Sequence, residues 1–214
     1  MRALLLLAAL GAGYAVYRMR AATPEGEADA GTVAHDWTGY APEYWDMLQT
    51  MIDTPTENEA GARNVAAFLD MIARAEGGAW NALFGYPMAG RTFASFADHP
   101  RVRFYEKADE FIHNGRRDYT TAAGMYQETA TTFDRLSRKL GTQGFAPAVQ
   151  IAHATELIRE QGALSDVRAG RFTEALRKVA PIWASLPENI HKQPGQKTVA
   201  QVQAMYTNAG GVLA

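Results

Sequence analysis

Glu76 is the residue whose type and position most clearly suggest chemistry. It directly precedes Gly77 and Gly78, and this pair of glycines predicts the end of a helix. The carboxyl would then lie at the C-terminal end of an amphipathic helix, where desolvation and the negative end of the helix dipole both raise its pKa. A carboxyl that stays protonated can act as a general acid. On spacing alone, a solvated surface glutamate is the commoner explanation of such a residue.

The sequence lacks the other common catalytic patterns. It contains five histidines but no HExxH motif, and it has no cysteine for a thiol nucleophile or a zinc-thiolate site. It also has no G-x-S-x-G elbow, no phosphate-binding P-loop and no dinucleotide-binding G-x-G-x-x-G after a strand. No metal or other cofactor is therefore expected.

Length and composition predict one compact domain with an appendage. The chain has 214 residues, of which 47% are hydrophobic and 21% are charged, with a net charge of -2 that argues against a nucleic-acid partner. The charge is uneven, because residues 21–62 hold nine acidic residues and no Lys or Arg. Residues 63–214 hold 18 basic and 14 acidic residues, a net formal charge of +4. A mildly cationic domain suits a polyanionic polymer such as a bacterial cell wall, although this charge is also ordinary for a soluble domain.

The N-terminus predicts a segment that meets a membrane. An uncharged, mostly apolar run from Ala3 to Tyr17 lies between Arg2 and Arg18. As a helix it would rise about 22 Å, which is short of the roughly 30 Å hydrocarbon core and typical of a signal peptide or a weak anchor. Because Arg18 and Arg20 follow so closely, an uncleaved anchor or a releasable signal is favoured over a cleaved peptide. We therefore predict a signal or anchor helix at 1–20, an acidic spacer at 21–61 and a catalytic domain at 62–214.

The catalytic domain is expected to be α+β and mainly helical. Apolar spacing and Gly or Pro boundaries predict helices at about 62–76, 126–140, 147–161, 173–183 and 198–208. Between the first two, the segment 84–104 carries scattered Gly and Pro, which favours a small, irregular β-hairpin lobe.

Five segments of this domain carry a further signal: FLDMIARAEG (68–77), FASFADHPR (93–101), TAAGMYQ (121–127), IREQGAL (158–164) and IWASLP (182–187). Together they resemble the phage lambda-type endolysin family, whose members are lysozyme-like lytic transglycosylases of peptidoglycan. They occur in the order and at the spacing of the family, and the similarity runs from about residue 64 to residue 211. The resemblance implies a lysozyme-like fold for this domain.

The resemblance also implies that Glu76 is the catalytic acid. It would protonate the glycosidic oxygen between N-acetylmuramic acid and N-acetylglucosamine, and the C6 hydroxyl of the substrate would then attack to form a 1,6-anhydro sugar. Such a reaction needs no second catalytic carboxylate, so Asp98 is expected to form a turn.

Four further residues are implied to bind substrate: Tyr86, Gly124, Tyr126 and Gln127. For the last three, the alternative is a loop-to-helix cap with a core tyrosine. The chain departs from the AGRYQ motif of the family, since Met125 stands where Arg is usual. Trp183 is expected to belong to the core rather than to stack on a sugar.

Three functions remain open at this point. The leading one is a lytic transglycosylase, acting as a membrane-anchored or exported, periplasm-facing phage endolysin or as a virion-associated enzyme with other virion proteins as partners. The second is a hydrolytic muramidase, a lysozyme that uses water. The third is a non-catalytic wall-binding or virion structural protein that keeps the lysozyme-like fold.

Overall fold

The computed structural model describes residues 59–84, 90–104, 112–113, 116–117, 119–189 and 195–214. The hydrophobic helix predicted at 1–20 and nearly all of the predicted spacer at 21–61 lie outside these ranges. Within them, no helix is long and apolar enough to cross a membrane.

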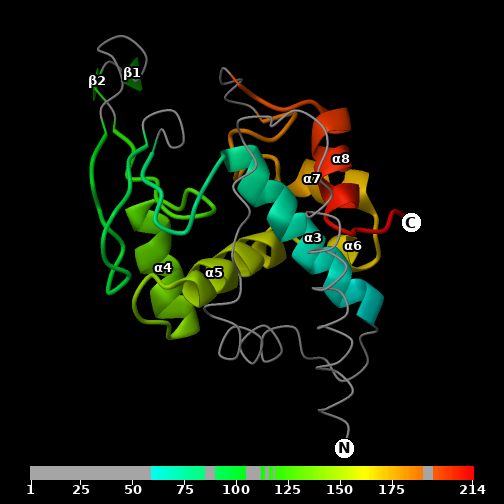
Figure 1. Ribbon diagram of the computed structural model, residues 1–214, viewed down its shortest axis with the longest axis horizontal. Helices are drawn as coiled ribbons and strands as arrows, with labels where there is room; N and C mark the ends of the chain where they lie inside the picture. The colour runs from blue at the N-terminus through cyan, green and yellow to red at the C-terminus, as the bar shows by residue number, and fades with distance from the viewer. Residues whose placement is uncertain (1–58, 85–89, 105–111, 114–115, 118, 190–194) are drawn as a thin grey trace, which may run out of the picture. The chain divides into compact units, whose positions relative to one another are not determined.

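The helix α3 (Glu59–Glu76) is central to the described part of the chain and carries the candidate acid at its last residue. Val65, Phe68, Leu69 and Ile72 are all buried, as the 3-4 spacing predicts. This face packs against α6 and α8, and α5 also contacts it (Figure 1). The predicted end at Glu76 is confirmed, whereas the helix begins three residues before the predicted start.

The described residues after α3 form five more helices: α4 (Ala130–Leu140), α5 (Pro147–Glu160), α6 (Leu164–Arg168), α7 (Phe172–Val179) and α8 (Val199–Asn208). Capping side chains and a proline explain where three of these helices begin. The Thr129 side chain caps α4, Pro147 occupies the first turn of α5, and Thr198 forms a capping box with Gln201 before α8. The predicted bounds of α5 and α8 are confirmed to within one residue.

Two predicted helix bounds were wrong, and one short helix was not predicted. The helix expected from residue 126 begins at Ala130, because Gln127 has a positive φ of 50° and Glu128 pairs with Ala123 in a β-bridge. The helix expected to reach residue 183 ends at Val179. The short helix α6 was not predicted, since it has only five residues.

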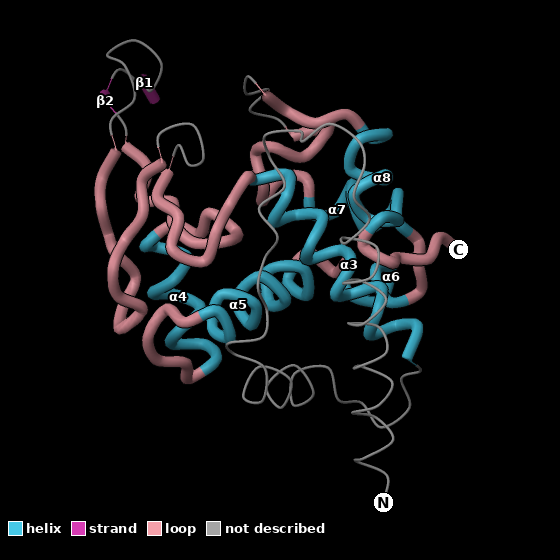
Figure 2. The backbone as a smooth tube through the Cα atoms, in the orientation of Figure 1, coloured by secondary structure: helices cyan, strands magenta, loops and turns pink. Residues whose placement is uncertain are grey.

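The small β lobe is present, but its hairpin lies downstream of the predicted segment. Strands β1 (Ile112–His113) and β2 (Arg116–Arg117) pair antiparallel, downstream of the expected segment at 84–104. The described parts of that segment form only isolated bridges, Ala82 with Thr92 and Phe104 with Thr120. Most of the described chain between α3 and α4 is loop (Figure 2).

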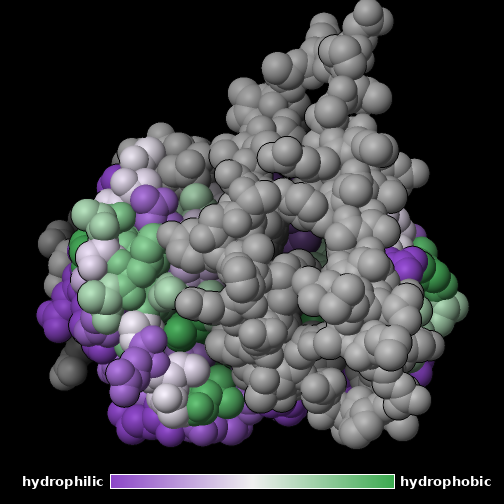
Figure 3. All heavy atoms as spheres, turned by 60° about the horizontal axis from the view of Figure 1, so that its bottom comes forward, coloured by the Kyte–Doolittle hydropathy of each residue, from purple (hydrophilic) through white to green (hydrophobic). Residues whose placement is uncertain are grey.

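Two hydrophobic centres hold these elements. Phe68, Phe172 and Tyr206 bring together α3, α7 and α8, with ring centroids 5.0 to 6.2 Å apart. A second cluster lies under the lobe and consists of Leu83, Ala123, Phe133, Phe145 and Val149. Where the described residues are visible in Figure 3, hydrophilic and hydrophobic residues lie side by side on the surface.

Candidate active site around Glu76

The end of α3 fixes the backbone at Glu76. Gly77 adopts a positive φ of 63°, its N–H donates to the Arg74 carbonyl at 3.3 Å, and the Gly78 N–H donates to the Ala73 carbonyl at 3.2 Å. These two bonds are those of a Schellman motif, which satisfies carbonyls that the helix leaves open. The glycine pair therefore stops the helix and holds the carboxyl of Glu76 at its end.

The Glu76 side chain is half-buried and bonded to a distant segment of the chain. The Ser185 hydroxyl donates to Oε1 at 2.5 Å, and the Ser185 N–H lies 3.4 Å from the same oxygen. Burial raises the pKa of Glu76, while the bonds from Ser185 and the positive charge of Lys197 partly oppose the rise. A raised pKa keeps the carboxyl protonated to higher pH, as a general acid requires. The predicted direction of the shift is confirmed.

Gly78 brings the segment 124–127 next to the end of α3. A Cβ added at Gly78 would lie 2.2 Å from the Met125 carbonyl oxygen, so only glycine allows this approach. Met125 itself is fully buried, and its N–H donates to the Gln150 side chain at 2.8 Å. At this position, where the resembled family usually has Arg, the chain therefore packs an apolar side chain in the core.

The residues predicted to bind substrate within this segment have internal roles. Gly124 has a positive φ of 76°, and Gln127 donates through its side-chain amide to the Gly124 carbonyl at 2.9 Å. Tyr126 is only 4% exposed, and its ring meets Trp80 edge-on at 6.3 Å. The alternative of a core tyrosine in a turn before the helix thus describes this geometry, and direct sugar contacts by Gly124, Tyr126 and Gln127 stay predictions. Tyr86 lies outside the described residues.

Trp183 connects the same segment to the Ser185 loop. Its indole N–H donates to the Tyr126 carbonyl at 3.1 Å, and the residue is 3% exposed. The core role expected for Trp183 is confirmed. Three segments that are far apart in the sequence, 76–78, 124–127 and 183–185, are therefore joined at one place.

Gln150 of α5 also holds this junction together, and its role was not predicted from the sequence. Its oxygen accepts from the Met125 N–H, and its amide nitrogen donates to the carbonyls of Trp80 and Phe145 at 2.9 and 2.8 Å. A buried amide with all these partners fixes the loops that it joins. Ser185, Lys197 and Gln150 had no local sequence signal, since each acts on residues far away in the chain.

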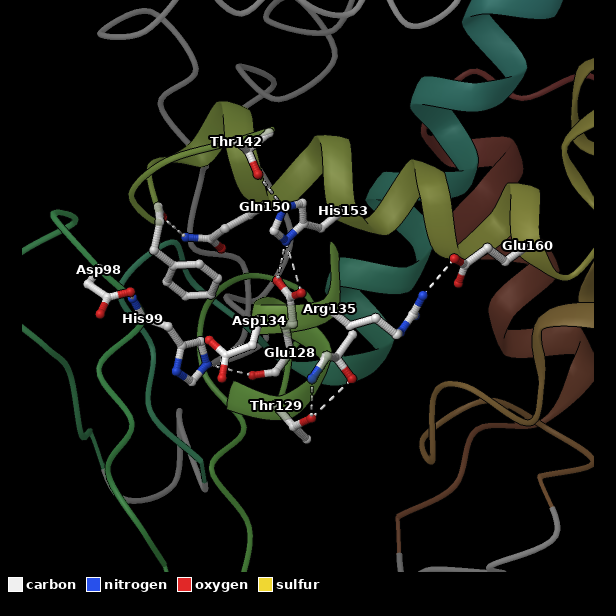
Figure 4. A network of polar contacts seen from close by, with 12 residues as sticks. Asp98, His99, Glu128, Thr129, Asp134, Arg135, Thr142, Gln150, His153 and Glu160 are labelled. Carbon is white, nitrogen blue, oxygen red and sulfur yellow. Dashed lines mark hydrogen bonds and ion pairs between the residues drawn. The ribbon is translucent and has the colours of Figure 1, made fainter. Parts of the chain in front are cut away.

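A second polar network joins the segment before α4, the loop after α4 and the helix α5 (Figure 4). The Glu128 carboxylate contacts Nδ1 of His153 at 3.0 Å, and Nε2 of His153 contacts the Thr142 hydroxyl at 2.8 Å. Burial raises the pKa of Glu128. Nδ1 of His99 accepts the Arg101 N–H, so Nε2 carries the proton that reaches the Glu128 carbonyl at 2.9 Å. Burial lowers the pKa of His99, which is thus held neutral.

Asp98 forms a turn, as expected. One of its oxygens accepts the His99 N–H at 2.8 Å, and the other lies 3.4 Å from the Arg101 guanidinium, which also pairs with Asp134. The described residues contain no group of three or more His, Asp or Glu that could hold a metal ion.

Comparison with known proteins shows the family of this chain. Residues 66–213 match the model of the Endolysin family. The chain belongs to the endolysin family. It is 35% identical over 160 residues to the endolysin of Escherichia phage P2, covering 70% of this chain and 94% of that protein. It is 31% identical over 153 residues to the endolysin of Escherichia phage lambda, covering 69% and 91%.

The fold of the described domain is similar to that of bacteriophage lambda lysozyme. A solved structure of that lysozyme complexed with a chitohexasaccharide superposes with a TM-score of 0.63 at 28% identity, covering 71% of this chain and 97% of the other. A second structure of lambda lysozyme gives a TM-score of 0.57 at 26% identity. The predicted lysozyme-like, mainly helical fold is therefore confirmed for the described domain.

Proposed function

We propose that this chain is a peptidoglycan-degrading lytic transglycosylase with Glu76 as its catalytic acid. The observation that carries the proposal is the half-buried carboxyl of Glu76, whose pKa is raised by burial and which Ser185 holds in one orientation. Membership of the endolysin family supports a substrate in the bacterial cell wall. The chitohexasaccharide bound to lambda lysozyme supports a glycan of N-acetylated amino sugars, the sugar class of peptidoglycan.

The reaction would proceed in two steps around one carboxyl. Protonated Glu76 donates its proton to the glycosidic oxygen, and the bond from that oxygen to C1 of N-acetylmuramic acid breaks. The carboxylate then accepts the proton of the C6 hydroxyl as O6 bonds to C1. The products are a free C4 hydroxyl and a 1,6-anhydro ring, no water is consumed, and Glu76 is protonated again.

The surroundings of Glu76 favour this route over hydrolysis. Among the described residues, the charge that acts on the Glu76 pKa is the cation of Lys197 rather than a second carboxylate. Asp98, the other acid considered from the sequence, is held by the His99 N–H and Arg101 in its own turn. A hydrolytic muramidase of the usual two-carboxylate type would need a second carboxylate as base or nucleophile, whereas in the transglycosylase the substrate supplies the nucleophile and Glu76 serves as the base.

Substrate contacts are proposed at Gly124, Tyr126, Gln127 and Tyr86. Gln127 is partly exposed and lies in the segment that Gly78 holds beside the end of α3. It would hydrogen-bond to the sugar from this position, while the buried Tyr126 would contribute mainly by shaping the same turn.

Export or anchoring is proposed for residues 1–20, with residues 21–61 as the spacer that lets the catalytic domain reach the wall. The chain would then serve as a lysis endolysin or as a virion-associated enzyme. Fractionation of expressing cells, with mass spectrometry of the N-terminal peptide, tests this proposal. A full-length chain in the membrane fraction supports an anchor, and a chain found only in the cytosol would contradict both export and anchoring.

The test of the proposed reaction is degradation of purified peptidoglycan by the full chain and by Glu76→Gln. The wild type should release muropeptides about 18 Da lighter than hydrolysis products, as loss of one water requires. Glu76→Gln should release none while folding normally. Reducing-end products would show a muramidase, and wall binding by the wild type without products would show a non-catalytic protein.

A further inference from the structure

Ser185 makes the polar contact that defines the orientation of Glu76. Its hydroxyl and its backbone N–H both point at Oε1, at 2.5 and 3.4 Å. Within the described part of the chain, no donor is bonded to Oε2. The two oxygens of the carboxyl are therefore in different environments.

The backbone around Ser185 is held on both sides. Its carbonyl accepts the Lys197 N–H at 2.8 Å, and the carbonyl of the fully buried Leu186 accepts the side-chain amide of Gln196 at 2.8 Å. On the other side lies Trp183, whose indole is fixed on Tyr126. The hydroxyl is thus presented from a rigid segment rather than from a loose loop end.

The asymmetry has a chemical consequence. In a neutral carboxylic acid one oxygen accepts hydrogen bonds and the other carries the proton. Because Oε1 accepts from Ser185, the proton resides on Oε2. We infer that Ser185 is a positioning residue that assigns the transferable proton of Glu76 to Oε2 and stabilises the carboxylate formed when that proton leaves.

The inference rests on the proposed function, because it gives Ser185 a part in the same reaction. Before proton transfer, the hydroxyl meets a neutral oxygen. After transfer, the same bond becomes charge-assisted and stronger, so it favours the transition state over the ground state. Lys197 is the charged group that acts on Glu76, and its attraction for the carboxylate adds to the same effect.

The test compares the wild type with Ser185→Ala and Ser185→Thr. Alanine removes the hydroxyl but keeps the backbone N–H, whereas threonine keeps both donors. The exposed Ser165 of α6 supplies the matched control Ser165→Ala. Lys197 is present in every variant, so its effect on the Glu76 pKa cancels.

Two measurements are made on each variant. The first is the dependence of kcat and KM on pH with purified peptidoglycan, where the alkaline limb reports loss of the Glu76 proton. The second is a carbon-13 NMR titration of the side-chain carboxyls of labelled glutamate, with Glu76→Gln identifying the signal of Glu76. The titration needs no activity, and thermal unfolding shows that each variant is folded.

Ser185→Ala should lower kcat about 10- to 100-fold with little change in KM, because a hydrogen bond to a charged group is lost. It should also raise the pKa of Glu76 and move the alkaline limb to higher pH, since the lost bond favoured the ionised form. Ser185→Thr and Ser165→Ala should match the wild type in both readouts.

A folded Ser185→Ala with the Glu76 pKa and alkaline limb of the wild type would overturn the inference, whatever its kcat. So would a loss of activity confined to KM. Failure of the proposed function is seen separately, as reducing-end products or no products from the wild type. In either case the NMR titration still decides whether Ser185 controls the ionisation of Glu76.

Discussion

Replacing Gly78 with alanine should displace the segment 124–127 from the end of α3. A Cβ at Gly78 would lie 2.2 Å from the carbonyl oxygen of Met125 and 2.7 Å from its carbonyl carbon. Contacts shorter than 3.0 Å are not tolerated, so the two segments must separate by about 1 Å. The obstacle is backbone, which cannot rotate away as a side chain can.

The loss of stability caused by Gly78→Ala can be estimated from the known cost of overpacking a protein core. Inserting a methyl group into a well-packed site typically costs about 1 to 3 kcal/mol, and the rigid obstacle favours the upper end. For a domain of this size, about 3 kcal/mol corresponds to a fall in Tm of about 6 to 12 °C. A misplacement of about 1 Å at a catalytic site can reduce the rate about 100-fold.

The control is Gly141→Ala at the end of α4. Gly141 has a positive φ of 69° but nothing within 4 Å of an added Cβ, so alanine there costs backbone strain alone, about 1 kcal/mol. Calorimetry and a peptidoglycan turbidity assay are run on both variants. Gly78→Ala should lose more Tm than Gly141→Ala and most of its activity, whereas the control should stay active. A Gly78→Ala protein with the Tm and activity of the wild type would refute the close approach.

Three further predictions concern the dependence of stability on pH. The folded pKa of Glu76 is raised, so its contribution to stability is present below about pH 4.5 and lost as the pH rises through the folded value. The Glu76→Gln variant should therefore unfold at a higher denaturant concentration than the wild type at pH 7, and this difference in midpoint should close below pH 4.5. The same difference at both pH values would contradict the effect of burial. Glu160, whose pKa is lowered to about 2 by Arg135 and Lys139, should show the opposite sign, so that Glu160→Gln is less stable than the wild type at pH 7. The folded pKa of His99 is lowered, so its contribution is present above about pH 6.5 and lost as the pH falls. His99→Gln should flatten the decline in the free energy of unfolding between pH 7 and 5, and a slope equal to that of the wild type would show that His99 is not held neutral.

The sequence predicted those features that depend on local signals. The end of α3 followed from Gly77 and Gly78, and the start of α5 followed from Pro147. The start of α4 did not, because a β-bridge from Ala123 to Glu128 overrides the helical pattern at Tyr126. The hairpin was placed too early for a similar reason, since tertiary pairing decides which loop residues form strands.

The acid of the candidate site could be predicted, but the groups that control it could not. Glu76 stands out by its position at a helix end and by the family resemblance. Its partner Ser185 lies 109 positions away, and nothing in the IWASLP segment indicates that its serine faces a carboxyl. Gln150 likewise joins Trp80, Met125 and Phe145 only through the fold.

The most direct test of the central claim is whether water enters the product. Peptidoglycan is digested by the full chain in oxygen-18 water, and the released muropeptides are analysed by mass spectrometry beside a Glu76→Gln digest. A transglycosylase that uses the C6 hydroxyl forms 1,6-anhydro ends without the heavy isotope, and Glu76→Gln forms none. Reducing ends that carry oxygen-18 at C1 would contradict the account and assign the second step to water.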